Sequence, residues 1–169
     1  MNTLATKTSF HRSVALSVMT QSRLPRAGSD SFSQAIRTAL DTIDSSTLQP
    51  VAPRDAGTAF QPKAMLATII YCYARQIYGS SDIENLLADN LDENPFCLNM
   101  RPDAQLIQEF RNKNRGTIQL CLITALWLLG QQKVREGTVT KVSDKHLEEE
   151  ASRRIIMAMF TDCMALGEG

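Results

Sequence analysis

The stretch PKAMLATIIYCYARQIYG, residues 62–79, limits the possible folds more than any other part of the sequence. Its apolar residues recur every four positions in two adjacent rows: Met65, Ile69, Tyr73 and Ile77, with Leu66 and Ile70. This spacing predicts an α-helix, and Pro62 suits its first turn and Gly79 its end. Because the helix is apolar around most of its circumference, other elements must surround it.

The remaining patterns are also helical, so the sequence predicts an all-α fold, a small helical bundle. Further helices are expected over residues 31–44, 81–90, 103–113 and 117–132, and from Asp144 onward. Ser81 and Glu84 have the spacing of a capping box, and Asp103 is a good N-cap. Gly116 is expected to mark a break or a kink. Only GTVTKV, residues 137–142, has any strand character.

Buried positions follow from the same periodicity. The helix over 117–132 is expected to pack Ile118, Leu122, Ala125, Trp127 and Leu129 inward. The last helix is expected to bury the stripe Ile155, Ile156, Met159, Phe160 and Cys163. Phe96 and Leu98, in the loop around Pro95, are expected to insert into the core.

Three parts of the chain are predicted. Residues 1–57 are a disordered or partly helical tail and linker, 58–132 a helical domain, and 133–169 a C-terminal linker and helix. The first 29 residues hold four basic residues and no acid. That composition is compatible with a mitochondrial transit peptide, but we interpret it as a flexible basic arm.

Composition excludes several classes of protein. Eighteen basic and 18 acidic residues balance, so any attraction to nucleic acid must come from a local patch. The four cysteines are far apart, without a C-x-x-C pair, so neither zinc nor another cofactor is expected. The longest apolar run, residues 120–130, is well below the ~18 residues that span a membrane. The expected location is the cytoplasm, with reduced thiols.

The helix that follows Arg101-Pro102-Asp103 carries the candidate site. Its apolar face contains Leu106, Ile107 and Phe110, and its other face is rich in amides and arginines. Such side chains pair with base edges and phosphates. The candidate DNA-binding residues are Arg101, Gln105, Gln108, Arg111, Asn112, Asn114 and Arg115. From the residues alone, an ordinary hydrated helix face is the favoured interpretation.

The order of these motifs resembles the N-terminal domain of insertion-sequence transposases of the IS5/IS1182 type, a DUF772-like domain. The resemblance covers about residues 58–130. It rests on Pro62, Lys63, Leu66, Tyr71, Tyr73, Ser80, Ser81, Ile83, Glu84, Arg101, Pro102, Asp103, Ile107, Phe110, Arg111 and Arg115.

The resemblance implies DNA binding at transposon ends. If the helix over 103–113 faces DNA, the helix over 81–90 is expected to brace it in a helix-turn-helix-like arrangement. The long loop between the two helices, and the acids Asp82, Glu84 and Asp89 that would repel phosphates, count against that arrangement. The resemblance also implies that catalysis belongs to a downstream RNase-H-like domain, in which three acidic residues hold two divalent metals. We do not expect that chemistry here, because residues after 130 have a helical pattern. We interpret Glu148–Glu150 as a solvated face.

Two functions are therefore compatible with the sequence. The first is a transposase-related DNA-binding domain without the catalytic domain, possible partners being transposon ends, a second copy or an intact transposase. The alternative is a helical protein-interaction module, without nucleic-acid contact, that dimerises through the apolar C-terminal helix.

Overall fold

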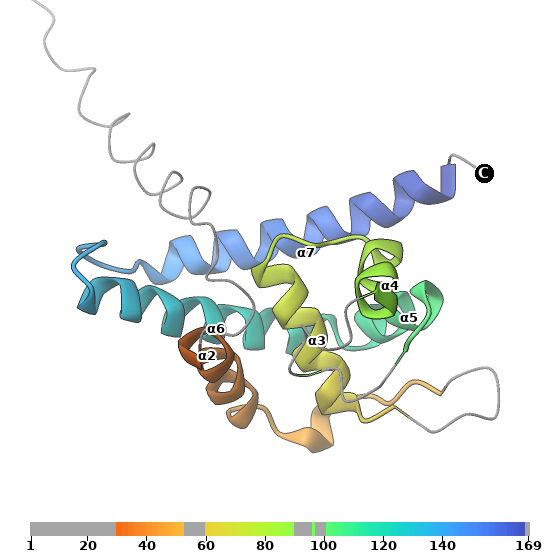
Figure 1. The fold of residues 1–169 in the computed structure, drawn as a ribbon, viewed down its shortest axis with the longest axis horizontal. Helices are drawn as coiled ribbons and strands as arrows, with labels where there is room; N and C mark the ends of the chain where they lie inside the picture. Colours follow the sequence, from red (N-terminus) through yellow and green to blue (C-terminus); the bar gives the residue numbers. More distant parts are fainter. Residues whose placement is uncertain (1–29, 53–59, 90–95, 97–100, 168–169) are drawn as a thin grey trace, which may run out of the picture.

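The computed structural model describes residues 30–52, 60–89, 96 and 101–167. Within these residues the chain forms α-helices and one 3-10 turn, and no strand, which confirms the predicted all-α bundle (Figure 1). The elements are α2 (Asp30–Asp41), η1 (Ser45–Thr47), α3 (Pro62–Ala74), α4 (Ser80–Asp89), α5 (Ala104–Lys113), α6 (Arg115–Arg135) and α7 (Asp144–Gly167).

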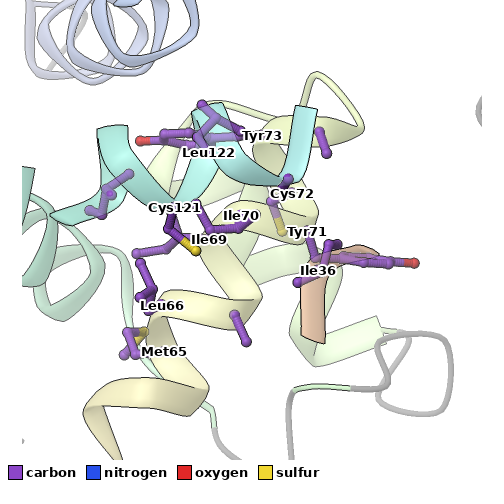
Figure 2. Packing of buried hydrophobic residues seen from close by; sticks show 14 of the residues in the cluster. Ile36, Met65, Leu66, Ile69, Ile70, Tyr71, Cys72, Tyr73, Cys121 and Leu122 are labelled. Carbon is purple, nitrogen blue, oxygen red and sulfur yellow. The ribbon is translucent and has the colours of Figure 1, made fainter. Parts of the chain in front are cut away.

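Helix α3 is the centre of the bundle, as its apolar circumference predicts. Every residue from Met65 to Ala74 is buried, and Figure 2 shows this helix packed against α6 through Cys121 and Leu122. Pro62 occupies the first turn, as expected. The predicted end at Gly79 is wrong, because the helix stops at Ala74.

The early end of α3 is a left-handed turn without glycine. Gln76 has a φ of 63°, and the Ile77 N–H donates to the Cys72 carbonyl at 2.9 Å. The Gln76 N–H also donates to the Tyr73 carbonyl at 3.1 Å, which completes a Schellman-type cap. Residues 75–79 are therefore a connection that directs the chain into α4.

Helix α2 confirms the helix expected over 31–44 and belongs to the same core. Phe32, Ile36, Ala39 and Leu40 are buried, and the helix packs against α3 and α6. Helix α7 also packs along α6 (Figure 1). The division into parts at 57/58 and 132/133 stays a prediction, while helices on both sides of each boundary share one hydrophobic core.

Helices α4 and α5 pack against each other, as a helix-turn-helix-like pair requires, but residues 90–103 connect them. This is far longer than the three or four residues of that motif's turn. Phe96, from this connection, is buried as predicted, and Leu98 lies outside the described residues. The capping-box prediction is wrong: the Glu84 carboxylate accepts a hydrogen bond from the Ala104 N–H at 3.0 Å, at the start of α5.

The break between α5 and α6 occurs at Asn114 and not at Gly116. Asn114 has φ −115° and ψ 21°, and its side chain donates to the Phe110 carbonyl at 3.0 Å. Its amide thus competes with the helix backbone for an acceptor, which favours termination. Gly116 lies inside α6 with open space beside it.

Several residues expected in the core are exposed. Ile118, Leu122 and Ala125 are buried, but Trp127 is exposed. In the α7 stripe only Ile155 is buried, while Ile156, Met159, Phe160 and Cys163 face solvent. Helix α7 instead turns Leu147, Ala151, Ile155 and Ala158 inward. The small alanines allow α7 to approach α6 closely.

Two further sequence interpretations need correction. Residues 137–142 form turns and irregular backbone. Glu150 is buried and not solvated, because its carboxylate accepts hydrogen bonds from Arg153 and from Arg154 Nε at 2.7 Å. The Arg154 guanidinium in turn donates to the Tyr73 carbonyl at 2.7 Å. The ion pair lies within α7, and the hydrogen bond from Arg154 fixes that helix to the end of α3.

In the part of the chain that the structure describes, no helix combines the length and the apolarity that crossing a membrane requires. The same residues contain no group of three His, Cys, Asp or Glu side chains placed to hold a metal ion.

Candidate nucleic-acid interface

The candidate site begins where α5 starts. The Asp103 carboxylate accepts a hydrogen bond from the Leu106 N–H at 2.7 Å, which confirms the predicted N-cap. Pro102 is buried and Arg101 is exposed. The buried proline and the cap fix the direction in which α5 leaves the loop, and Leu106, Ile107 and Phe110 attach its inner face to the core.

Five candidate residues form what we call the polar stripe: Arg101, Gln105, Gln108, Asn112 and Arg115. All are exposed except Gln108, which is half-buried. Gln105, Gln108 and Asn112 are spaced by three and four residues along α5, the spacing of one helical face. Arg115, the first residue of α6, lines the same pocket as Gln108 and Asn112. Among the described residues, no carboxylate forms an ion pair with either arginine of the stripe. Their guanidinium groups are therefore available to an anionic partner.

Arg111 does not belong to this surface, so its expected outward orientation is wrong. Its residue is only 8% exposed, and the guanidinium points into the bundle. It donates to the Tyr78 carbonyl at 2.7 Å and to the Tyr73 hydroxyl at 3.1 Å. It also donates to the Ser80 hydroxyl and to the Asp162 carboxylate of α7. We call these five residues the Arg111 cluster.

Asp162 has a second role in the cluster, at the start of α4. Its carboxylate accepts a hydrogen bond from the Ser80 N–H at 2.8 Å and another from the Ser80 hydroxyl at 2.9 Å. The negative charge thus satisfies a free N–H at the N-terminus of α4 and also neutralises Arg111. The cluster joins α5 and α7 to the connection between α3 and α4.

Burial dominates the chemistry of the Tyr73 hydroxyl in this cluster. It raises the pKa of Tyr73 to about 12, although the charge and hydrogen bond of Arg111 act in the opposite direction. Tyr73 is therefore a neutral phenol at physiological pH, and its hydroxyl serves as an acceptor for Arg111. This arrangement is structural, because the Arg111 guanidinium is bonded to groups of the bundle and not presented to a ligand.

Asn114 is also removed from the predicted site, because only 2% of the residue is exposed. Its amide oxygen accepts a hydrogen bond from the Gln49 N–H at 2.7 Å, and its amide nitrogen donates to the Gln49 carbonyl at 2.9 Å. These two bonds mimic a backbone pair and attach the segment after η1 to the α5–α6 junction. The expectation that Asn114 faces a ligand is wrong.

The polar stripe borders a pocket of about 200 Å³ between the α5–α6 junction and α7. Gln108, Asn112 and Arg115 line one side, with the Arg111–Asp162 pair also in the wall. The opposite wall is formed by Ile155, Met159 and Cys163. The side of the polar stripe that faces solvent is therefore accessible. On its inner side the stripe borders the Arg111–Asp162 ion pair, whose charges already neutralise each other.

Sequence reasoning missed Asp162 and Ser80. A signal for Asp162 existed, since it lies four residues after Ala158 and seven after Ile155, on the buried side of α7. A carboxylate at a core position requires a buried donor as its partner. Nothing in the order of residues indicated that this partner was Arg111, 51 positions earlier.

Comparison with known proteins adds one positive finding. The model of a family described as "Transposase domain (DUF772)" matches residues 21–113, more than half of the chain. The matched region includes α2 to α5, and thus the stripe from Arg101 to Asn112. Searches of curated proteins and of solved structures gave no significant match.

Proposed function

The chain belongs to the transposase domain (DUF772) family, and on that premise we propose that it binds DNA at transposon ends through the polar stripe. The observation that carries the proposal is the accessible row of Arg101, Gln105, Gln108, Asn112 and Arg115, whose two arginines have no carboxylate partner among the described residues. Helix α5 approaches the duplex together with Arg101 before its start and Arg115 at the start of α6.

The chemistry of the stripe supports this role. A guanidinium can bind phosphate or a guanine edge through two parallel hydrogen bonds, and a glutamine or asparagine amide can pair with adenine. The exposed acid of α5, Glu109, is paired with Lys113 at 2.7 Å, so that pair adds no net charge to the surface. With a formal net charge of zero for the whole chain, the attraction is local to the stripe.

The proposed activity is recognition without strand cleavage. As the resemblance implies, the metal-dependent chemistry would belong to a separate RNase-H-like domain, and this chain would act with an intact transposase or compete with it for the same ends. We place this activity in the cytoplasm.

The test is a fluorescence-anisotropy titration of the full chain with duplexes from the DNA that flanks its gene, repeated over a salt series. Counterion release predicts that the logarithm of the affinity falls linearly with the logarithm of the salt concentration. The double variant Arg101→Ala, Arg115→Ala should weaken binding about tenfold or more and reduce that slope by about two, one for each lost phosphate contact.

The matched control is Arg135→Ala with Lys141→Ala, which removes the same charge at and beyond the opposite end of α6. Both residues are exposed, so the variant should fold normally and keep its slope. Equal losses in the two double variants, or no salt-dependent binding by the unmodified chain, would show that the stripe is an ordinary hydrated face.

A further inference from the structure

The outward side of α7 changes its chemistry halfway along the helix. Up to Arg153 this side is charged, with Lys145, Glu148 and Glu149 exposed. From residue 156 onward it is apolar, and the exposed residues Ile156, Met159, Phe160, Cys163 and Met164 follow the spacing of one helical face. The outward side of α7 therefore has a charged first half and a short apolar second half.

This face extends onto α6 and makes one continuous surface, the α7 patch: Leu120, Ile156, Met157, Met159, Phe160 and Met164. Leu120, Ile156 and Met157 line one part of a groove of about 740 Å³ between α6 and α7, and Glu148, Glu149 and Arg153 line its other part. The six residues are 38–58% exposed, and Phe160, at the middle of the face, is the most exposed of them.

The size of the patch calls for a partner. With about 200 Å² for a large side chain, half exposure leaves roughly 600 Å² of apolar surface. That is at the upper limit of what monomeric proteins expose as one patch. Two such surfaces in contact would bury on the order of 1,200 Å², which is enough for a specific interface, though a small one.

We propose that the α7 patch is the interface of a homodimer, in which the α7 helices of two copies cross antiparallel about a two-fold axis at Phe160. A two-fold contact requires a surface complementary to itself, and an apolar face meets this requirement. About Phe160, Ile156 of one copy lies level with residue 164 of the second, so the apolar half of each α7 lies against that of the other.

The charges fix the direction of the pair. In the antiparallel arrangement, Arg153 of one copy lies level with residue 167, where the second α7 ends. The charged half of α7 then extends past its partner into solvent. The Arg153 side chain is 46% exposed and paired with Glu150 of its own helix, and it approaches the negative end of the partner's helix dipole. A parallel pair would place Glu148 and Glu149 opposite their own copies, which is unfavourable.

Sedimentation equilibrium of the full chain without DNA tests the proposal independently of the proposed function. We expect a mass of 18.8 kDa in dilute solution and twice that mass at higher concentration, with a dissociation constant in the micromolar range. Phe160→Glu should raise that constant about 30-fold, because it places a charge at the centre of the interface. Lys145→Glu also makes α7 more negative, but outside the interface, and should leave the constant unchanged.

A cross-linking experiment tests the direction of the helices. In a Cys163→Ser background, a short bis-maleimide should join two copies of the Phe160→Cys variant. It should not join two copies of Lys145→Cys, since antiparallel helices place those positions about 45 Å apart. A chain that stays monomeric, a dimer that Phe160→Glu leaves intact, or cross-linking through position 145 would each overturn the proposal.

Discussion

Replacing Asp162 by alanine separates the structural role of the Arg111 cluster from any role in binding DNA. The variant leaves the Arg111 guanidinium inside the bundle without its carboxylate, at a site where the two side chains are only 9% and 14% exposed. Removing one partner of a buried ion pair costs about 3–5 kcal/mol. Arg111 keeps three other acceptors, from Tyr73, Tyr78 and Ser80. The cost of leaving its charge without a carboxylate should therefore lie near the lower end of that range.

The variant also removes the acceptor for the Ser80 N–H at the start of α4, which adds about 1 kcal/mol. Because 14% of the Asp162 side chain is exposed and solvent screens part of the interaction, we expect a total loss of about 3 kcal/mol in the free energy of unfolding. With a urea dependence of about 2 kcal/mol per molar, the midpoint of urea unfolding should fall by about 1.5 M. Far-UV circular dichroism measures it directly.

Two comparisons make this prediction specific. Glu109→Ala breaks the exposed pair with Lys113 and should change the stability by less than ~0.5 kcal/mol. The double variant Arg111→Met, Asp162→Ala should lose at least about 1 kcal/mol less than the two single variants added together, since neither charge is then left unpaired. An Asp162→Ala variant as stable as Glu109→Ala, or strict additivity in the cycle, would refute the argument that the cluster is a buried and coupled unit.

Two further predictions concern titration and reactivity. Burial raises the pKa of Glu150, but the hydrogen bonds and charges of Arg153 and Arg154 outweigh it and hold that pKa below the ordinary 4.5. The stabilisation is therefore complete above pH 4.5 and is lost as the pH falls through the lower folded pKa. Urea midpoints at pH 7 and pH 4 should accordingly differ less in Glu150→Gln than in the unmodified chain. Burial also raises the pKa of the Cys121 thiol to about 12, whereas Cys163 is exposed. In dilute protein at pH 8, Cys163→Ser should remove a fast-reacting thiol in a DTNB assay. Cys121→Ser should lower only the number of thiols that become reactive after the protein is unfolded in urea.

Local patterns in the sequence were sufficient for the helices and for most of their starts. Pro62 and Asp103 act through the backbone of their own first turns, so their effects depend on few other residues. The end of α3 was not predictable in the same way. Gln76 takes the left-handed conformation usually given to glycine, because the chain must turn there to enter α4.

The candidate site shows the same division. Periodicity placed the amides of α5 opposite Leu106, Ile107 and Phe110, and Gln105 and Asn112 are exposed there. Arg111 lies four residues after Ile107 and next to Phe110, at the border between the two faces. A residue at a border is buried or exposed according to what covers it. Here α7 supplies Asp162, and the connection between α3 and α4 supplies further acceptors.

The sequence by itself determined an all-helical chain with α3 at its centre, because a helix that is apolar on every side has no stable place except the core. Only the tertiary structure decided which side of α7 is buried, since this helix carries apolar residues on both sides. The side with Ala151 and Ala158 allows the closest approach to α6, and it also brings Asp162 and Arg154 to their buried partners. The larger Ile156, Met159 and Phe160 are left outside for that reason, and periodicity alone carries no information about this choice.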